Sequence, residues 1–234
     1  MRINATRRLR RERAQADPAL KLVRAFAAPG ACMMDLGAGI GTYCLEARRH
    51  YDSIWAVEPN PALYEDLVTV MGYGDRVLNA TLAQKTGSAT FRIPLPRDSD
   101  WHTRSDVASM VTDLSSRDVL IPAIALDELA LGRLDLLRVH LEDGALAALQ
   151  GGRSTIDRHR PACIIACEPG SAEQALLFSW FDDLGYHGFH IDGGVLRQIT
   201  RTDTTSSMHT MIFLNARSLD HLERVSAIFP LPAS

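Results

Sequence analysis

The sequence predicts an α/β fold with a mostly parallel, seven-stranded sheet and helices on both faces. Two observations support this fold class. Short apolar runs alternate with helical segments from residue 31 onwards, and strand–helix–strand units in series pair in parallel through right-handed crossovers. A glycine-rich turn follows the first apolar run, and an acid ends the second. Both features fall at the carboxyl ends of expected strands, where such sheets bind ligands.

The composition is that of an ordinary globular domain. The chain has 234 residues, of which 46% are hydrophobic and 23% are charged, and its net charge is −3. This length buries a sizeable core in one domain of the larger kind, which we place at residues 31–234. No apolar run approaches the ~20 residues of a membrane span, and the N-terminus lacks the apolar stretch of a signal peptide. We therefore expect a cytoplasmic protein with no membrane partner.

The cysteines are expected to be reduced thiols in the core. Each lies in an apolar run, and no Cys-x-x-Cys spacing occurs. No other cluster has the spacing of metal ligands, so the sequence gives no support to a metal site. The four cysteines are Cys32, Cys44, Cys163 and Cys167.

Residues 1–30 form a basic segment ahead of the domain. Residues 1–26 carry eight basic and two acidic side chains, a net charge of +6, which leaves −9 for the remainder. We expect a helix that Asp17 caps and Pro18 begins, packed on the domain. A basic arm can also indicate a nucleic-acid partner. No aromatic residue is interleaved before Phe26, which favours the solvated helix.

The first half of the domain alternates strands with helices. A strand that ends in an acid is followed by the glycine turn, and Thr42 begins a helix after it. Asn60 caps the next helix with Pro61 at its first position, and Gly72-Tyr73-Gly74 ends it. The expected strands here lie at about 31–36, 53–57, 76–81 and 88–93, and the helices at about 42–50 and 61–71.

A long polar segment, 94–105, separates the two halves of the domain. It contains several residues that break helices and strands, and a loop of this length is usually functional or disordered. Trp101 and His102 lie in its middle, so we expect a lid or an acceptor-binding loop. The alternative is a surface aromatic residue that packs the loop down.

The second half supplies the remaining strands. The run at 119–126 is expected to be an edge strand, because Pro122 cannot donate to a β-ladder. The run at 161–168 is a core strand with Glu168 at its tip, and Ser171 begins a helix after it. The other expected elements are a strand at 134–142, helices at 143–150 and 171–184, and closing strands at 189–191, 195–199 and 210–214.

The glycine turn follows the pattern Asp-x-Gly-x-Gly-x-Gly from Asp35 to Gly41. A dinucleotide fingerprint would need a glycine at position 42, where Thr42 stands. The pattern instead resembles motif I of the S-adenosylmethionine (SAM) methyltransferases, in which the loop backbone lies against the methionine part and the acid lies near its amine. The implied cofactor-binding residues are Asp35, Gly37, Ala38, Gly39, Gly41 and Thr42.

Glu58 is the second cofactor signal. It follows Asp35 by 23 residues, which is about one helix plus one strand, so it lies at the tip of the neighbouring parallel strand. A carboxylate there can accept hydrogen bonds from both ribose hydroxyls. We also expect Pro59 and Asn60 at this strand end, and Ala80 and Thr81 at the next, to bind the cofactor.

The order of four motifs resembles the FkbM family of SAM-dependent O-methyltransferases over roughly residues 31–170. They are Asp35-Leu-Gly-Ala-Gly-Ile-Gly, Val57-Glu58-Pro59-Asn60-Pro61, Ile124-Ala-Leu-Asp127-Glu-Leu and Leu134-Asp-Leu-Leu-Arg-Val-His-Leu-Glu142. The resemblance implies a Rossmann-like class I methyltransferase fold and methylation of sugar or polyketide hydroxyls. The fourth motif of the family typically ends Lys-Ile-Asp-Val-Glu-Gly-Ala-Glu. This chain keeps Glu142 but has His140 at the strand-end Asp.

His140 is the expected catalytic residue. Methyl transfer to a hydroxyl needs the acceptor oxygen in place and its proton removed, and a neutral histidine suits that proton transfer. Glu142 could orient His140 or bind acceptor hydroxyls. Glu168, Trp101 and His102 are the expected substrate-binding residues.

Two other functions stay open. His140 in place of the family Asp could have removed catalysis and left a binding or scaffold protein. A nucleic-acid methyltransferase is less favoured, because the Asn/Asp-Pro-Pro-Tyr/Phe motif for amine acceptors is absent. The identity of the acceptor and the oligomeric state, a homo-oligomer included, are also left open.

Overall fold

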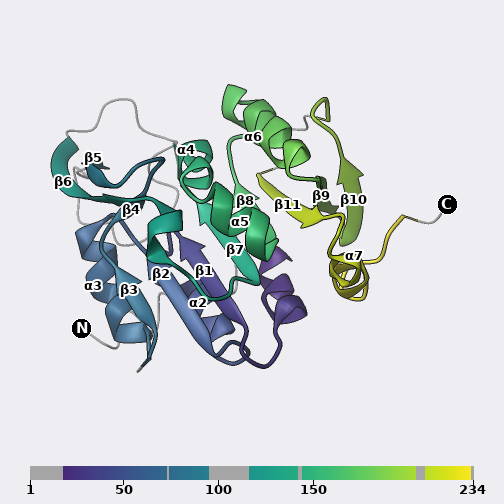
Figure 1. Cartoon of the computed structure of the whole chain (residues 1–234), viewed down its shortest axis with the longest axis horizontal. Coiled ribbons are helices and arrows are strands. Elements are labelled where there is room, and N and C mark those ends of the chain that lie inside the picture. Colours follow the sequence, from purple (N-terminus) through teal and green to yellow (C-terminus); the bar gives the residue numbers. More distant parts are fainter. Residues whose placement is uncertain (1–17, 73, 95–115, 142–143, 204–208, 233–234) are drawn as a thin grey trace.

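The computed structural model is built around an eight-stranded sheet in the order β10-β9-β11-β8-β7-β1-β2-β3 (Figure 1). The structure describes residues 18–72, 74–94, 116–141, 144–203 and 209–232. The strands of this sheet are β1 (Cys32–Leu36), β2 (Ser53–Val57), β3 (Arg76–Leu78), β7 (Leu136–His140), β8 (Ala162–Ala166), β9 (Tyr186–Asp192), β10 (Val195–Ile199) and β11 (Thr210–Asn215).

The prediction of a mostly parallel sheet is confirmed. The five strands from β8 to β3 in this order pair in parallel. Because β11 is antiparallel to both β8 and β9, β9 runs in the same direction as those five. The count of seven strands was too low by one, since β10 pairs with β9 as an antiparallel hairpin. Gly193 and Gly194 join the two strands, both with positive φ, which suits a tight hairpin turn.

Helices cover both faces of the sheet. Adjacent residues of β1 show the division, because Met33 packs into one core cluster and Met34 into the other. The 3₁₀ helix η1 and the helices α2 and α7 lie on the Met33 side, whereas α4, α5 and α6 lie on the Met34 side. The bounds are η1 (Pro18–Phe26), α2 (Thr42–Ala47), α3 (Pro61–Val70), η3 (Leu126–Leu129), α4 (Ala145–Gln150), α5 (Arg153–His159), α6 (Ala172–Asp183) and α7 (Leu219–Ser226).

The basic segment is described only from Pro18 onwards. There the expected helix is the 3₁₀ helix η1, whose buried side chains pack against α2 and α7. Asp17 and the arginines before it lie outside the described residues. The division at residue 30 stays a prediction.

A separate three-stranded sheet, with the order β4-β6-β5, lies at the opposite end of the molecule from β10 (Figure 1). Its strands are β4 (Thr81–Leu82), β5 (Gly87–Pro94) and β6 (Ser116–Ile124). The expectation of an edge strand around Pro122 is wrong, because β6 is the middle strand. The ladder tolerates the proline because β4 pairs only with Ala123 and Ile124, beyond it.

The expected strand at 76–81 is divided between the two sheets. β3 ends at Leu78 and pairs with β2, and the chain then crosses to β4 at Thr81. Among the described residues, no helix is long and apolar enough to cross a membrane.

Candidate functional site

The glycine turn is fixed to the ends of the strands on either side of it. The main-chain N–H groups of Gly37 and Ala38 both donate to the carbonyl oxygen of Val57, at 2.9 and 3.1 Å. On the other side, a Cβ at Gly37 would lie 2.0 Å from the carbonyl oxygen of His140. Glycine is therefore required at position 37 so that β7 can approach, independently of any ligand.

Gly39 has a different reason to be a glycine. Its φ is +57°, and a Cβ built on it would meet no described atom within 4 Å. The space beside this residue is therefore open, and its backbone can be approached closely. A ligand that lies against the turn would occupy this space.

Glu58 meets the turn through its carboxylate. Oε2 accepts the N–H of Gly39 at 2.7 Å, and Oε1 accepts the N–H of Asn60 at 2.8 Å. The residue is 4% exposed. Burial raises the pKa of Glu58 to about 7, although the two N–H donors act in the opposite direction.

The backbone at this strand end is held from β3. Nδ2 of Asn79 donates to the carbonyl oxygens of Glu58 and Pro59, at 2.9 and 3.2 Å. The N–H of Glu58 donates to the carbonyl of Leu78 at 3.0 Å. Ala80, which is buried, and Thr81 follow Asn79 directly, so the third strand end lies next to Glu58.

Asp35 lies in the core and pairs with Arg138. The two residues are opposite each other in the β1–β7 ladder, and Nη1 of Arg138 is 2.7 Å from Oδ1 of Asp35. The Sγ of Cys44 donates to the other oxygen at 3.4 Å. Asp35 is fully buried, and its carboxylate anchors the guanidinium from β7. The amine contact implied for this acid stays a prediction.

Arg138 is well enclosed. Its side chain is 12% exposed, and its guanidinium lies over the ring of Tyr43 at 4.2 Å from the centroid. Burial is the largest single influence and disfavours the charged form, but the charge and hydrogen bond of Asp35, together with Tyr43 and Cys44, outweigh it and hold the pKa of Arg138 above its ordinary value. Burial, followed by the nearby charge of Asp35, raises the pKa of the Cys44 thiol. This thiol is therefore a core residue and not a nucleophile.

His140 ends β7, beside the glycine turn, and is exposed. Its Nδ1 lies 2.6 Å from Nη2 of Arg138. Because alternate residues of a strand share a face, Arg138 and His140 project from the same side of β7. Sequence reasoning missed Arg138 as a site residue, and this spacing was the signal that could have revealed it.

The structure brings most of the expected site residues to one edge of the sheet. The turn residues up to Thr42, the strand end from Glu58 to Asn60, and His140 lie at the carboxyl ends of the adjacent strands β1, β2 and β7. Glu168 is exposed and follows the next strand, β8. Three expected residues lie outside the described part of the chain, namely Trp101, His102 and Glu142. The roles of these residues stay predictions.

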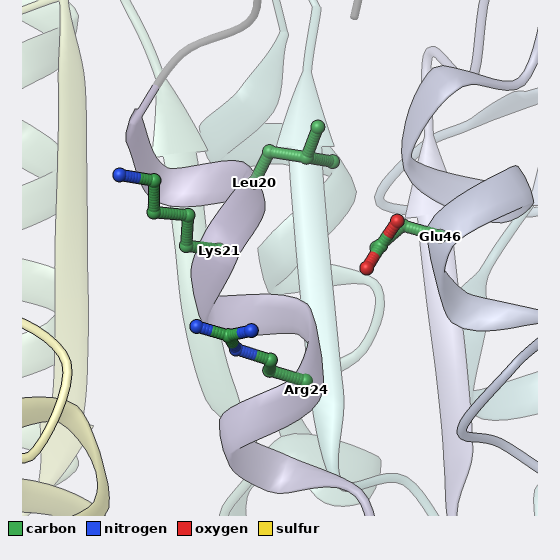
Figure 2. A pocket seen from close by; sticks show the side chains of 4 residues that line it. All are labelled: Leu20, Lys21, Arg24 and Glu46. Carbon is green, nitrogen blue, oxygen red and sulfur yellow. The ribbon is translucent and has the colours of Figure 1, made fainter.

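A pocket lies elsewhere, between η1 and α2 (Figure 2). Leu20, Lys21 and Arg24 of η1 line it, and Glu46 of α2 faces them from across the gap. None of the residues expected to bind cofactor or substrate lines this pocket. It is separate from the candidate site.

Comparison with known proteins gives one family. The model described as "Methyltransferase FkbM domain" matches residues 35–189. No curated protein matches the chain.

Solved methyltransferase structures are similar to this chain at low identity. One is an FkbM methyltransferase from Methylobacillus flagellatus KT, with 18% identity and a TM-score of 0.49; the similarity covers 77% of this chain and 42% of that one. This chain therefore spans less than half the length of that protein. Another is a TehB-like SAM-dependent methyltransferase from Corynebacterium glutamicum ATCC 13032 Kitasato, with 13% identity and a TM-score of 0.48, covering 92% of this chain and 97% of that one.

Proposed function

Because the chain belongs to the FkbM methyltransferase family, we propose that it transfers a methyl group from SAM to a hydroxyl oxygen of a small molecule. The family match confirms the resemblance drawn from the four motifs. The nature of the acceptor, a sugar or a polyketide hydroxyl, is part of the proposal.

One observation carries the proposal of a SAM site. The N–H of Gly39 meets the carboxylate of Glu58, and the space beside Gly39 is open. The residues present fit the cofactor. The bare backbone at Gly39 would lie against the methionine part, and Glu58 would accept the ribose hydroxyls. When bound, SAM supplies an activated methyl group, and the protein supplies position and electrostatics.

We propose that the acceptor binds at the carboxyl ends of β7 and β8. His140 is exposed and its backbone packs against Gly37, so it lies beside the turn that would hold the cofactor. A group there can hold an acceptor oxygen in reach of a methyl group, which accounts for a large part of the rate in such reactions. Glu168 is exposed after the neighbouring strand, which supports its proposed role in binding other polar groups of the acceptor.

The test is mass spectrometry of reaction mixtures that hold the protein, SAM and a panel of sugars, phenols and polyketide-like alcohols. We expect a product heavier by one methyl group and an equal amount of S-adenosylhomocysteine. Glu65→Gln, on the exposed face of α3, serves as a control variant that should behave as the wild type.

A second candidate function is a binding protein with a methyltransferase fold, because His140 stands where the family has Asp. SAM that binds but is never consumed over the whole panel would favour this alternative. Neither binding nor turnover would contradict both functions.

A further inference from the structure

Arg138 connects the core of the site to its exposed histidine. One arm of its guanidinium, Nη1, is 2.7 Å from Oδ1 of Asp35 and 3.2 Å from the carbonyl oxygen of Gly37. The other arm, Nη2, is 2.6 Å from Nδ1 of His140. The stacked ring of Tyr43 covers one side of the guanidinium, so the fork is held in place.

This geometry determines which nitrogen of His140 carries a hydrogen. A guanidinium only donates hydrogen bonds, and it keeps its charge in proteins. Nδ1 must therefore accept, and a nitrogen that accepts has no hydrogen of its own. A neutral imidazole has one hydrogen, so His140 carries it on Nε2.

A histidine in this form cannot remove a proton from an acceptor. Its lone pair on Nδ1 is engaged by Arg138, and Nε2 is already protonated. A second proton would have to displace Arg138 from Nδ1 and would leave two cations in contact. The group can instead donate a hydrogen bond from Nε2.

We propose that Arg138 is a positioning residue that fixes His140 as the Nε2–H tautomer, so that His140 holds the acceptor oxygen by donating to it. The hydrogen bond from His140 to the acceptor oxygen rests on the proposed function, whereas the tautomer of His140 does not. A donor of this kind stabilises negative charge on oxygen. It therefore suits an acceptor with an acidic hydroxyl, such as a phenol, which can arrive as the anion and needs no base from the protein.

The experiment is ¹⁵N NMR of the whole chain with labelled histidine, recorded without SAM or acceptor. The spectrum of His140→Gln identifies the signals of His140 by their loss. In the wild type we expect Nδ1 to resonate as an unprotonated ring nitrogen and Nε2 as a protonated one. A protonated Nδ1 in the wild type would overturn the proposal without any variant.

Two variants then test the part of Arg138. In Arg138→Lys, the single ammonium group should stay with the charged Asp35, so we expect the His140 signals to move towards the average of two tautomers. The matched control is Arg133→Lys, in the segment that precedes β7, where Arg133 pairs with Asp135 at 2.8 Å. We expect no change at His140 in the control.

His140 signals that are the same in Arg138→Lys as in the wild type would also overturn the proposal. Thermal unfolding of each variant shows whether it is folded. If Arg138→Lys is not folded, the protonation of Nδ1 and Nε2 in the wild-type spectrum alone tests the proposal. Because no methyl transfer takes place in the NMR tube, failure of the proposed function and failure of this inference are separate results.

Discussion

The main-chain N–H of Gly39 donates to Oε2 of Glu58 across 2.7 Å, although the two residues are 19 positions apart. The first lies in the turn after β1, and the second lies at the end of β2. The parallel pairing of Leu36 with Val57 brings these two strand ends level. The backbone of the turn and the strand-end carboxylate therefore meet at one edge of the sheet, where we propose the cofactor site.

Glu58 should make the stability of the protein depend on pH. In the unfolded chain its carboxyl ionises near the ordinary value of 4.5, whereas in the folded protein it stays protonated up to about 7. Between these values the folded state binds more protons, so its stability falls as the pH rises, by up to about 1.4 kcal/mol for each pH unit.

We expect Glu58→Gln to remove this fall. Urea unfolding at several pH values should show the variant gaining stability relative to the wild type from pH 4.5 to 7 and no further gain above that window. A constant difference between the two proteins would mean that Glu58 is not protonated in the fold.

Removing only one partner of the ion pair between Arg138 and Asp35 should destabilise the folded protein. Arg138→Met leaves the fully buried carboxylate of Asp35 without its cation, and we expect a loss of about 3–5 kcal/mol in the free energy of unfolding. The double variant Asp35→Asn with Arg138→Met removes both charges and should lose less. If chemical denaturation gives the same loss of unfolding free energy for the single and the double variant, the unpaired charge of Asp35 is not the cause of the destabilisation.

Asp127 should stabilise a helix that lies far from it in the sequence. Its two oxygens accept the N–H groups of Thr155 and Ser154, at 2.7 and 3.1 Å, in the first turn of α5. Asp127 therefore caps α5 from outside the helix, because Gly152 at the N-cap position has no side chain. We expect Asp127→Ala to cost about 1 kcal/mol in thermal or urea unfolding. Asp127→Asn, which keeps one acceptor, is the matched comparison and should lose less.

His140→Ala should reduce turnover and leave SAM affinity unchanged. Loss of a donor to a charged oxygen typically lowers the rate by about 10²-fold or more. With a substrate found in the panel, kcat would be measured alongside calorimetry of SAM, and His187→Ala, an exposed position on β9, is the control. A larger loss for a phenol than for a benzyl alcohol is expected if His140 donates to an anion. A full rate in the variant would remove His140 from the mechanism.

The elements predicted well from the sequence are those with local signals. The glycine turn, the Asn60 cap with Pro61 at the first helical position, and the Ser171 cap of α6 all depend on neighbouring residues. The spacing from Asp35 to Glu58 is one strand–helix–strand unit, so it placed both at the same edge of the sheet. The contact of Glu58 with Gly39, in the turn that follows Asp35, depends on that unit.

The parts that the sequence did not reveal depend on distant pairings. Arg138 and Asp35 are 103 residues apart, and only the register of β1 with β7 brings them together. α5 was missed because Gly151-Gly152 resembles the end of a helix, while the cap comes from Asp127. The second sheet was missed because β6 pairs with β4 as well as with β5. Pro122 in β6 argues against a strand with neighbours on both sides.

Calorimetric titration of SAM into the wild type and into Gly39→Arg tests the central claim most directly. Because the open space beside Gly39 would be filled by the arginine side chain, we expect measurable binding by the wild type and none by a folded Gly39→Arg variant. Equal SAM affinity in the two proteins, or no binding by the wild type, would contradict the assignment of this turn as the cofactor site.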